Sequence, residues 1–304
     1  ILALIMVACG GDTAEETVEE AAPEVVETLD SPAVTTASTV KTGVGVTSDP
    51  CPEVIGGIPT GADPSKGCIY LGLLNDYTGP FGPYGIPLET GQRGFWLWAN
   101  QSGGIGDYSV AIIEGYDTQY NPQKHLEGYK AIRDEVAALA MSLGTPQTQF
   151  ILDDMDADNM IAAPMSWYSG WSYKSSDRGL VVEFGAAYCA DGMNAVDWAM
   201  ANLPVDIKTI GVMGYAGDYG GDYAAGIRVA AEANGLEVAW EYIVPSTEFD
   251  VAQAVGLMVT KPVDAYFPAI GPTFMAQVAG GAFQQGLTPI AMMAAPSYLS
   301  LIHI

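Results

Sequence analysis

From residue 68 onward, short runs of consecutive hydrophobic residues alternate with segments whose hydrophobic residues have helical spacing. The hydrophobic runs predict strands at Ile69–Leu74, Tyr108–Glu114, Ala137–Leu143, Met160–Ala163, Leu180–Phe184, Ile207–Met213, Val238–Val244, Ala265–Ala269 and Ile290–Met293. The segments between them predict helices at Leu88–Asn100, Pro122–Asp134, Thr148–Met155, Ala190–Leu203, Gly220–Asn234, Val251–Val259 and Thr273–Gln285. This alternation indicates an α/β fold with parallel sheets covered by helices on both faces.

The predicted strands are more numerous than one modest sheet usually carries. We therefore divide the chain near residues 186–194 into two Rossmann-like lobes with a cleft between them. In open α/β sheets, ligands bind beyond the carboxyl ends of the strands. The cleft is thus the expected place for a ligand.

Charge and composition narrow the function and set apart the first part of the chain. The 304 residues include 36 acidic and 11 basic side chains, a formal charge of -25. Binding to nucleic acid is excluded as a function, because phosphate groups require the opposite sign. Residues 9–66 are rich in Glu, Thr, Ala, Pro and Ser without a hydrophobic period, which predicts a disordered acidic linker.

Both ends of the chain carry segments that do not look like parts of a globular domain. The first eight residues are too short to span a bilayer and are typical of the end of a signal peptide. Ile5–Cys9 resembles a lipobox, which implies a lipid on Cys9; the alternative is the frayed end of a globular domain. Residues 299–304 resemble the translation of a transposon end and are interpreted as a non-native tail.

The remaining cysteines fit an exported protein. Cys51 and Cys68 bracket a short loop rich in Pro and Gly. A disulfide between them would fix the linker to the first predicted strand, and we expect this pair to be bonded.

The segment from Cys68 to Gly94, CIYLGLLNDYTGPFGPYGIPLETGQRG, is a strand, a loop and the start of a helix. It resembles the first strand and loop of periplasmic substrate-binding proteins of ABC transporters, in the branched-chain amino acid (leucine-binding-protein-like, type I) family. Thr78-Gly79-Pro80 and Tyr84-Gly85 match the motifs that lie at the mouth of the ligand cleft in that family. The resemblance continues through GYDTQYNP (residues 115–122), AGDYGGDYAAG (216–226) and STEFD (246–250).

The resemblance implies a type I periplasmic binding protein fold that is truncated at its C-terminus. Residues 67–188 would form the first ligand-binding lobe and residues 189–270 the second. Residues 271–298 would begin the return to the first lobe. No internal repeat supports another arrangement.

The resemblance also implies a set of ligand-binding residues. These are Tyr84, Thr145, Thr148, Ser166, Trp167 and Tyr219. Thr145 would bind a ligand carboxylate, or serve only as a helix N-cap. Trp167 and the aromatic residues after it would stack on a planar ligand or pack the hinge. Tyr219 would close on the ligand from the second lobe, or belong to its core.

Two positions depart from the pattern of relatives that bind amino acids. Those relatives carry a second-lobe Tyr near the position that Ile270-Gly271 occupies in this chain. Near the position of Ser297 they carry a Glu, which pairs with the α-ammonium group of the bound amino acid. A buried ammonium without a carboxylate is costly. We therefore doubt a branched-chain amino acid and leave amides, carboxylates, urea-like compounds and aromatic solutes open.

The sequence contains no convincing motif of an enzyme active site or a metal site. DDMDADN (residues 153–159) lacks the Gly and the closing Glu of a Ca²⁺ loop, and His125 has no metal-spaced partner. No phosphate-binding loop or serine nucleophile turn is present in the sequence, so no enzyme activity and no cofactor are expected.

The sequence therefore predicts an extracytoplasmic solute-binding lipoprotein of an ABC importer. It would be a monomer held to the outer face of a membrane only by the lipid on Cys9. Its partners would be a small polar solute (an amino acid, amide or carboxylate-like compound) and a membrane permease. The alternatives are the ligand-sensing domain of a receptor and an α/β enzyme.

Overall fold

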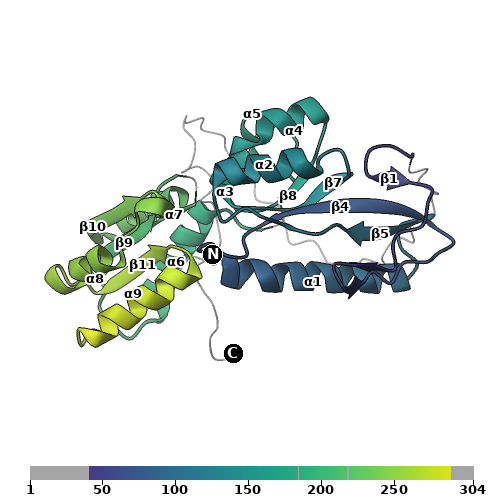
Figure 1. The fold of residues 1–304 in the computed structure, drawn as a ribbon. Coiled ribbons are helices and arrows are strands. Elements are labelled where there is room, and N and C mark those ends of the chain that lie inside the picture. The colour runs from purple at the N-terminus through teal and green to yellow at the C-terminus, as the bar shows by residue number, and fades with distance from the viewer. Residues whose placement is uncertain (1–40, 184, 218, 289–304) are drawn as a thin grey trace, which may run out of the picture.

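The computed structural model describes residues 41–183, 185–217 and 219–288. Within these ranges the chain forms two α/β lobes that lie side by side (Figure 1). The first lobe extends from β1 to α5 and the second from α6 to α9. No helix of the described ranges combines the length and the hydrophobicity that crossing a membrane requires.

The first lobe is built on a six-stranded sheet in which β4 is central. Its strands are β1 (Val46–Thr47), β4 (Gly67–Asn75), β5 (Tyr108–Ile112), β6 (Tyr116–Asp117), β7 (Ala138–Leu143) and β8 (Ala162–Met165). Strand β4 pairs in parallel with β5, β6 and β7, and β7 pairs in parallel with β8. Because these strands run in parallel, the loops that follow them meet at one edge of the sheet.

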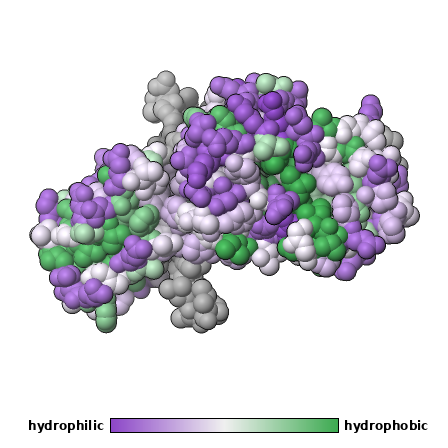
Figure 2. Space-filling model, in the orientation of Figure 1, coloured by the Kyte–Doolittle hydropathy of each residue, from purple (hydrophilic) through white to green (hydrophobic). Residues whose placement is uncertain are grey.

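The helices of the first lobe cover both faces of its sheet (Figure 1). They are α1 (Gly82–Gln101), α2 (Pro122–Ile132), α3 (Thr145–Phe150), α4 (Leu152–Asp158), the 3₁₀ helix η1 (Ser169–Ser172) and α5 (Lys174–Asp177). Asn121 begins α2 by accepting hydrogen bonds from the backbone N–H groups of Gln123 and Lys124. Figure 2 shows hydrophilic residues gathered over α2, α4 and α5 on the visible face of this lobe.

The second lobe contains a three-stranded parallel sheet in the order β10-β9-β11. Its elements are α6 (Tyr188–Asn202), β9 (Thr209–Tyr215), α7 (Gly220–Asn234), β10 (Glu237–Val244), the 3₁₀ helix η2 (Ser246–Glu248), α8 (Val251–Thr260), β11 (Ala265–Ala269) and α9 (Pro272–Gln284). Every residue of β11 is buried, as expected for a parallel strand with both faces covered. Gly235, with a φ of 69°, ends α7 where the sequence predicted a stop.

The helices α6 and α7 of the second lobe approach one another closely. A Cβ atom at Gly226 would lie 1.9 Å from the carbonyl oxygen of Cys189, and one at Gly192 would lie 2.4 Å from that of Tyr223. Glycine at these two positions therefore allows the backbones to pack against each other. This contact places the start of α7 beside the start of α6, where both face the first lobe.

The alternation of strands and helices predicted from the sequence is confirmed, but several boundaries differ. The helix predicted at Leu88–Asn100 begins six residues earlier, at Gly82. The helix predicted at Thr148–Met155 is two short helices, α3 and α4, that share Ile151 as a cap residue. Within the described residues 180–183 of the strand predicted at Leu180–Phe184, only Val181 forms a bridge, to Ala162.

Two expectations about the organisation of the chain are wrong within the described residues. Residues 41–66, expected to be disordered, pack on the first lobe through β1, through the hairpin of β2 (Val54–Ile55) and β3 (Ile58–Pro59), and through a disulfide between Cys51 and Cys68. Helix α9, expected to begin the return to the first lobe, packs mainly on α8 of the second lobe. Its buried residues Val278 and Ala282 belong to the core there. The strand predicted at Ile290–Met293 lies outside the described residues.

Candidate functional site

A buried carboxylate shapes the loop between β4 and α1. The oxygens of Asp76 accept hydrogen bonds from Gly79 N at 2.5 Å and Phe81 N at 2.8 Å. Burial raises the pKa of the Asp76 carboxyl, and these backbone hydrogen bonds act against the rise. A Cβ atom at position 79 would lie 2.6 Å from Asp76 Oδ1, so glycine is required there. The loop ends at Phe81, the cap residue of α1, and the Phe81 ring packs against Tyr215 and Tyr219 of the second lobe.

A small inner cavity of about 20 Å³ lies between the two lobes. It is lined by Phe81, Tyr84, Tyr120, Leu143, Gly144, Met165, Trp167, Tyr188 and Tyr219. The first seven residues come from the first lobe, while Tyr188 begins α6 and Tyr219 is the cap residue of α7. The cavity is therefore formed jointly by the two lobes.

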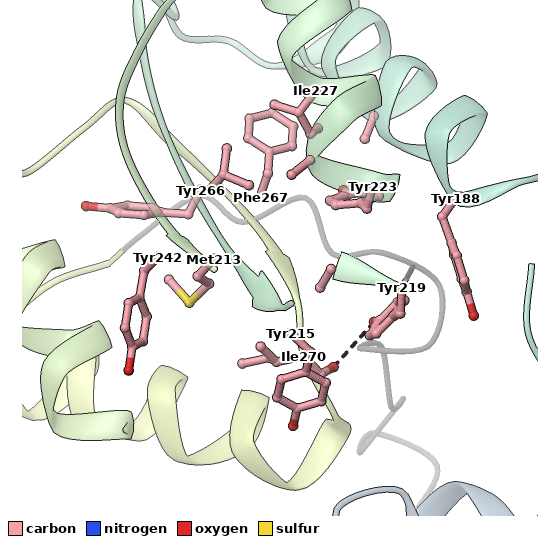
Figure 3. Packing of buried hydrophobic residues seen from close by; sticks show 14 of the residues in the cluster. Tyr188, Met213, Tyr215, Tyr219, Tyr223, Ile227, Tyr242, Tyr266, Phe267 and Ile270 are labelled. Carbon is pink, nitrogen blue, oxygen red and sulfur yellow. Dashed lines mark hydrogen bonds between the residues drawn. The ribbon is translucent and has the colours of Figure 1, made fainter. Parts of the chain in front are cut away.

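The aromatic rings around the inner cavity are packed against one another. The ring centroids of Phe81 and Tyr120 are 4.4 Å apart, and those of Tyr188 and Tyr219 are 4.8 Å apart. Phe81 also meets Tyr219 across the lobe boundary at 6.1 Å with an edge-to-face geometry. Figure 3 shows Tyr188 and Tyr219 at the border of the second lobe's hydrophobic core, with the Tyr219 hydroxyl directed at the carbonyl oxygen of Ile270.

Three of the ligand-binding residues predicted from the sequence line the inner cavity. They are Tyr84, Trp167 and Tyr219. Tyr84 lies in the first turn of α1 rather than in a loop, so the helix holds its side chain in place. Trp167 also stacks edge-to-face on Tyr188, with the ring centroids 6.1 Å apart.

The three hydroxyl residues predicted to bind the ligand lie behind the cavity wall. Thr145 and Ser166 are each 1% exposed, and their hydroxyl oxygens are 2.6 Å apart. The indole N–H of Trp171 donates to Ser166 Oγ at 2.8 Å. The Tyr188 hydroxyl contacts both Thr145 and Ser166, and these contacts offset part of the rise in the Tyr188 pKa that burial causes. We call these four side chains the hydroxyl cluster.

Thr148 lies one turn deeper and belongs to a separate network. Its hydroxyl donates to the carbonyl oxygen of Gly144 at 2.8 Å and contacts Ser142 Oγ at the same distance. Ser142 in turn contacts Nε2 of His125, which is fully buried. This network joins β7, α2 and α3, so Thr148 supports the turn at Gly144 instead of facing the cavity.

Phe81, Tyr120 and Tyr188 were not among the site residues predicted from the sequence. Phe81 and Tyr120 lie within or next to motifs that carried the family resemblance, and Tyr188 precedes a predicted helix. A search for aromatic residues just before the starts of predicted helices could have found Tyr120 and Tyr188, but not Phe81. Their convergence on one cavity depends on how the two lobes meet.

A larger groove, with a volume of about 460 Å³, lies beside the inner cavity. From the first lobe it is lined by Pro80, Gln119, Tyr120, Asn121, Pro122, Pro146 and Gln147. From the second lobe it is lined by Ala216, Pro245, Ser246, Thr247, Phe249 and Phe274. We call it the outer groove. Tyr120 is a lining residue of both spaces.

The described residues that line the inner cavity carry no charged side chain. Its polar groups are the tyrosine hydroxyls, the Trp167 indole and the backbone at Gly144. Burial raises the pKa of the Tyr84 phenol, so the group stays protonated near neutral pH. The cavity therefore offers ring faces and neutral hydrogen-bonding groups to a guest.

Comparison with known proteins identifies the class of protein to which this fold and site belong. A family model described as periplasmic binding protein matches residues 68–303. The chain therefore belongs to the periplasmic binding protein family, and the resemblance and the fold class inferred from the sequence are confirmed. A search of curated proteins found no match.

Similar solved structures are substrate-binding proteins of ABC transporters. A fatty acid ABC transporter substrate-binding protein from Thermomonospora curvata is 27% identical, with a TM-score of 0.69 over 84% of this chain and 61% of its own. A branched-chain amino acid ABC transporter protein from Thermus thermophilus with bound valine is 15% identical, with a TM-score of 0.63 over 75% of this chain and 59% of its own.

A third structure is the solute-binding protein of an ABC transporter from Rhodopseudomonas palustris BisB5 in complex with 3,4-dihydroxy benzoic acid. It is 18% identical, with a TM-score of 0.62 over 72% of this chain and 59% of its own. The chain thus spans about 60% of the length of these three proteins. The family and these relatives are solute-binding transport proteins rather than enzymes.

Proposed function

We propose that this protein is the solute-binding component of an ABC importer, which captures a small solute between its lobes and releases it unaltered. The observation that carries the proposal is the inner cavity, whose walls come from both lobes. Separation of the lobes would open this cavity, since Tyr188 and Tyr219 would move away from Phe81 and Tyr84. A guest that contacts both walls stabilises the closed arrangement by its differential affinity for that state.

Release to a membrane permease follows from the same geometry. Closure brings the Phe81 loop of the first lobe against Tyr215 of the second, with ring centroids 6.1 Å apart. The closed surface therefore differs from the open one, which gives a permease a means to recognise the loaded protein. No bound cofactor takes part in such a cycle.

The same proposal places the protein outside the cytoplasm, attached to a membrane by a lipid on Cys9. The disulfide between Cys51 and Cys68 fits an oxidising compartment. Cys9 itself lies outside the described residues. Mass spectrometry of the protein purified from its native membrane tests the anchor, because a Cys9→Ser variant should lose the lipid mass and enter the soluble fraction.

The solute we propose is small and has a hydrophobic part, which differs from the polar solute inferred from the sequence alone. Aromatic side chains provide most of the inner cavity wall, and burial against them favours hydrophobic surface. The relatives with bound benzoate-type compounds or valine and the fatty acid transporter protein are consistent with a guest of this kind.

Solute capture is tested by titrating the full chain with benzoate, phenol, valine and octanoate while recording tryptophan fluorescence, with calorimetry for any solute that changes the signal. We expect at least one solute to bind, and Tyr84→Ala and Tyr219→Ala each to weaken that binding by about tenfold or more. Phe95→Ala is the matched control, because Phe95 lies on the exposed side of α1 with 53% of its surface accessible. Binding unchanged in both tyrosine variants would contradict the proposed site.

A further inference from the structure

The backbones of the two lobes come into close contact at Pro80 and Gly271. Pro80 lies in the loop between β4 and α1 of the first lobe, and Gly271 is the cap residue of α9 in the second. A Cβ atom at position 271 would lie 2.9 Å from the carbonyl oxygen of Pro80. Figure 1 shows the start of α9 next to the start of α1, in agreement with this contact. The first lobe therefore fills the space that a side chain at position 271 would need.

The backbone conformation at position 271 does not require glycine. Gly271 has a φ of -65° and a ψ of 150°, an extended conformation that residues with a side chain adopt readily. Its carbonyl oxygen accepts a hydrogen bond from Met275 N at 2.9 Å, as at an ordinary helix start. Of the three described atoms nearest to a Cβ at this position, two belong to Pro80. The approach of the other lobe is therefore what leaves little room for a side chain here.

The first-lobe side of this contact is held in place by two carboxylates. Asp76 accepts hydrogen bonds from Gly79 N at 2.5 Å and from Phe81 N at 2.8 Å. Asp117, at the end of β6, accepts a hydrogen bond from Tyr77 N at 3.0 Å. The loop is thus bonded both before and after its proline, so the proline carbonyl oxygen has little freedom to move away from the second lobe.

The second-lobe side of the contact is held by Tyr215, at the end of β9. The Tyr215 hydroxyl accepts a hydrogen bond from Gly271 N at 2.9 Å. The Tyr215 ring meets Phe81 of the first lobe edge-to-face, with the ring centroids 6.1 Å apart. Figure 3 shows Tyr215 beside Ile270, the residue before Gly271. The start of α9 is therefore fixed to a part of the second lobe that itself packs on the first lobe.

The contact borders the proposed binding site. Pro80 lines the outer groove, and Phe81, the next residue, lines the inner cavity. The inner cavity has a volume of about 20 Å³, which is about the space of one water molecule. A side chain at position 271 would push the Pro80 loop away from α9 and so widen the space between the lobes.

On the basis of the proposed solute-binding function, we propose that Gly271 is a positioning residue that determines how far the two lobes close. It acts through Pro80, whose carbonyl oxygen comes to rest against the start of α9 because position 271 has no side chain. A side chain at this position acts as a wedge between the lobes. It weakens solute binding because the solute then loses contacts with one of the two walls.

The first test is small-angle X-ray scattering by the full chain as wild type, Gly271→Ala, Gly271→Val and Gly280→Ala. Gly280 lies on the same helix, and a Cβ atom there would meet no described atom within 4 Å, so Gly280→Ala is the matched control. Each protein is measured without added solute and with benzoate, phenol, valine or octanoate. We expect a larger radius of gyration for Gly271→Val than for the wild type, an intermediate one for Gly271→Ala, and no change for the control.

Calorimetric titration with the same four solutes measures the consequence for binding. We expect the affinity for the best-bound solute to fall about fivefold or more in Gly271→Ala, because a methyl group added to a filled contact is unfavourable. The affinity should fall further in Gly271→Val and stay unchanged in Gly280→Ala. Urea unfolding shows whether each variant is folded, and Gly271→Ala carries the test if Gly271→Val does not fold.

A Tyr215→Phe background separates the two neighbours of position 271. The Tyr215 hydroxyl oxygen would lie 3.1 Å from a Cβ at this position, and it belongs to the same lobe. If the obstacle is Pro80, Gly271→Ala should weaken binding in the Tyr215→Phe background as it does in the wild type. Loss of the effect in that background would place the obstacle inside the second lobe and overturn the inference.

The scattering and binding results distinguish this inference from the proposed function. Equal radii of gyration for the wild type and the Gly271 variants under every condition would overturn the inference and leave solute capture intact. Absence of binding for all four solutes would count against the proposed function. The radii of gyration measured without added solute would then decide whether Gly271 sets the distance between the lobes.

Discussion

Ser169 and Asp222 are hydrogen-bonded across the boundary between the two lobes. Ser169 N donates to Asp222 Oδ2 at 2.9 Å, and the Ser169 hydroxyl donates to the two carboxylate oxygens at 2.9 and 2.8 Å. Ser169 begins η1 in the first lobe, and Asp222 lies in the first turn of α7 in the second. In the proposed cycle, separation of the lobes would break these bonds, so we expect them to act as an interlobe clasp.

Removing the clasp should weaken solute binding without unfolding the lobes. A hydrogen bond to a charged group contributes about 1.5–3 kcal/mol, so we expect Asp222→Ala to reduce affinity by about tenfold or more. Calorimetric titration with the best-bound solute measures the effect. Asp197→Ala on the exposed face of α6 is the control, and an affinity of Asp222→Ala equal to that of the control would show that the clasp does not support closure.

His125 should make the fold sensitive to acid. Burial lowers the pKa of the His125 imidazole to about 3 from 6.5, and its Nδ1 has no hydrogen-bond partner among the described residues. Between these pH values the unfolded chain binds a proton that the folded chain does not, so the free energy of unfolding falls as pH falls. The loss attributable to His125 approaches about 1.4 kcal/mol per pH unit below pH 6.

Urea unfolding of the wild type and His125→Gln at pH 7, 6 and 5 measures this contribution. Glutamine does not titrate and can still hydrogen-bond to Ser142, which contacts His125 Nε2 at 2.9 Å. The free energy of unfolding of the variant should therefore depend less steeply on pH than that of the wild type. The titration of acidic residues changes the stability of both proteins equally, so it cancels in the comparison. Identical pH profiles would mean that the pKa of His125 is the same in the folded and the unfolded protein.

The close packing of α6 on α7 predicts opposite effects for two glycines of the same helix. Gly226→Ala places a methyl group 1.9 Å from the Cys189 carbonyl oxygen and should destabilise the protein by about 1–3 kcal/mol. Gly221→Ala meets nothing within 4 Å and should stabilise it by about 0.5–1 kcal/mol. Urea unfolding of both variants gives the comparison. Equal stabilities would show that the two helices lie further apart than described.

The disulfide between Cys51 and Cys68 should stabilise the packing of residues 41–66 on the first lobe. The two cysteines are 17 residues apart, and closing a loop of this length contributes about 3 kcal/mol in the chain-entropy treatment. Dithiothreitol should therefore lower the free energy of unfolding of the wild type. A Cys51→Ser/Cys68→Ser variant should already be less stable and should respond less to the reductant.

The sequence predicted the alternation of strands and helices well because local periodicity reports burial directly. The parallel strand at Ala265–Ala269 was predicted with its observed limits, since all five residues are buried. The helix predicted at Leu88–Asn100 was too short at its start, because Pro and Gly in the segment before it resemble a loop. In the structure, Asp76 fixes that segment and the helix begins at Gly82.

The residues that face the cavity were harder to predict from the sequence. A polar side chain is available to a ligand only where no other group of the protein already hydrogen-bonds to it. Thr145 and Ser166 were expected to face a ligand, but their hydroxyls contact each other at 2.6 Å behind the cavity wall. Nothing in the spacing of the two residues along the chain reveals this contact. Tyr84 and Tyr219, which the resemblance implied as ligand-binding residues, line the inner cavity.

The sequence alone determined that this chain forms two α/β lobes of the periplasmic binding protein family, because hydrophobic periodicity and motif order are local properties. Only the tertiary structure decided that Phe81, Tyr120 and Tyr188 line the inner cavity and that Tyr120 also lines the outer groove. These residues lie far apart along the chain. Their meeting depends on the packing of one lobe against the other, which no local pattern records.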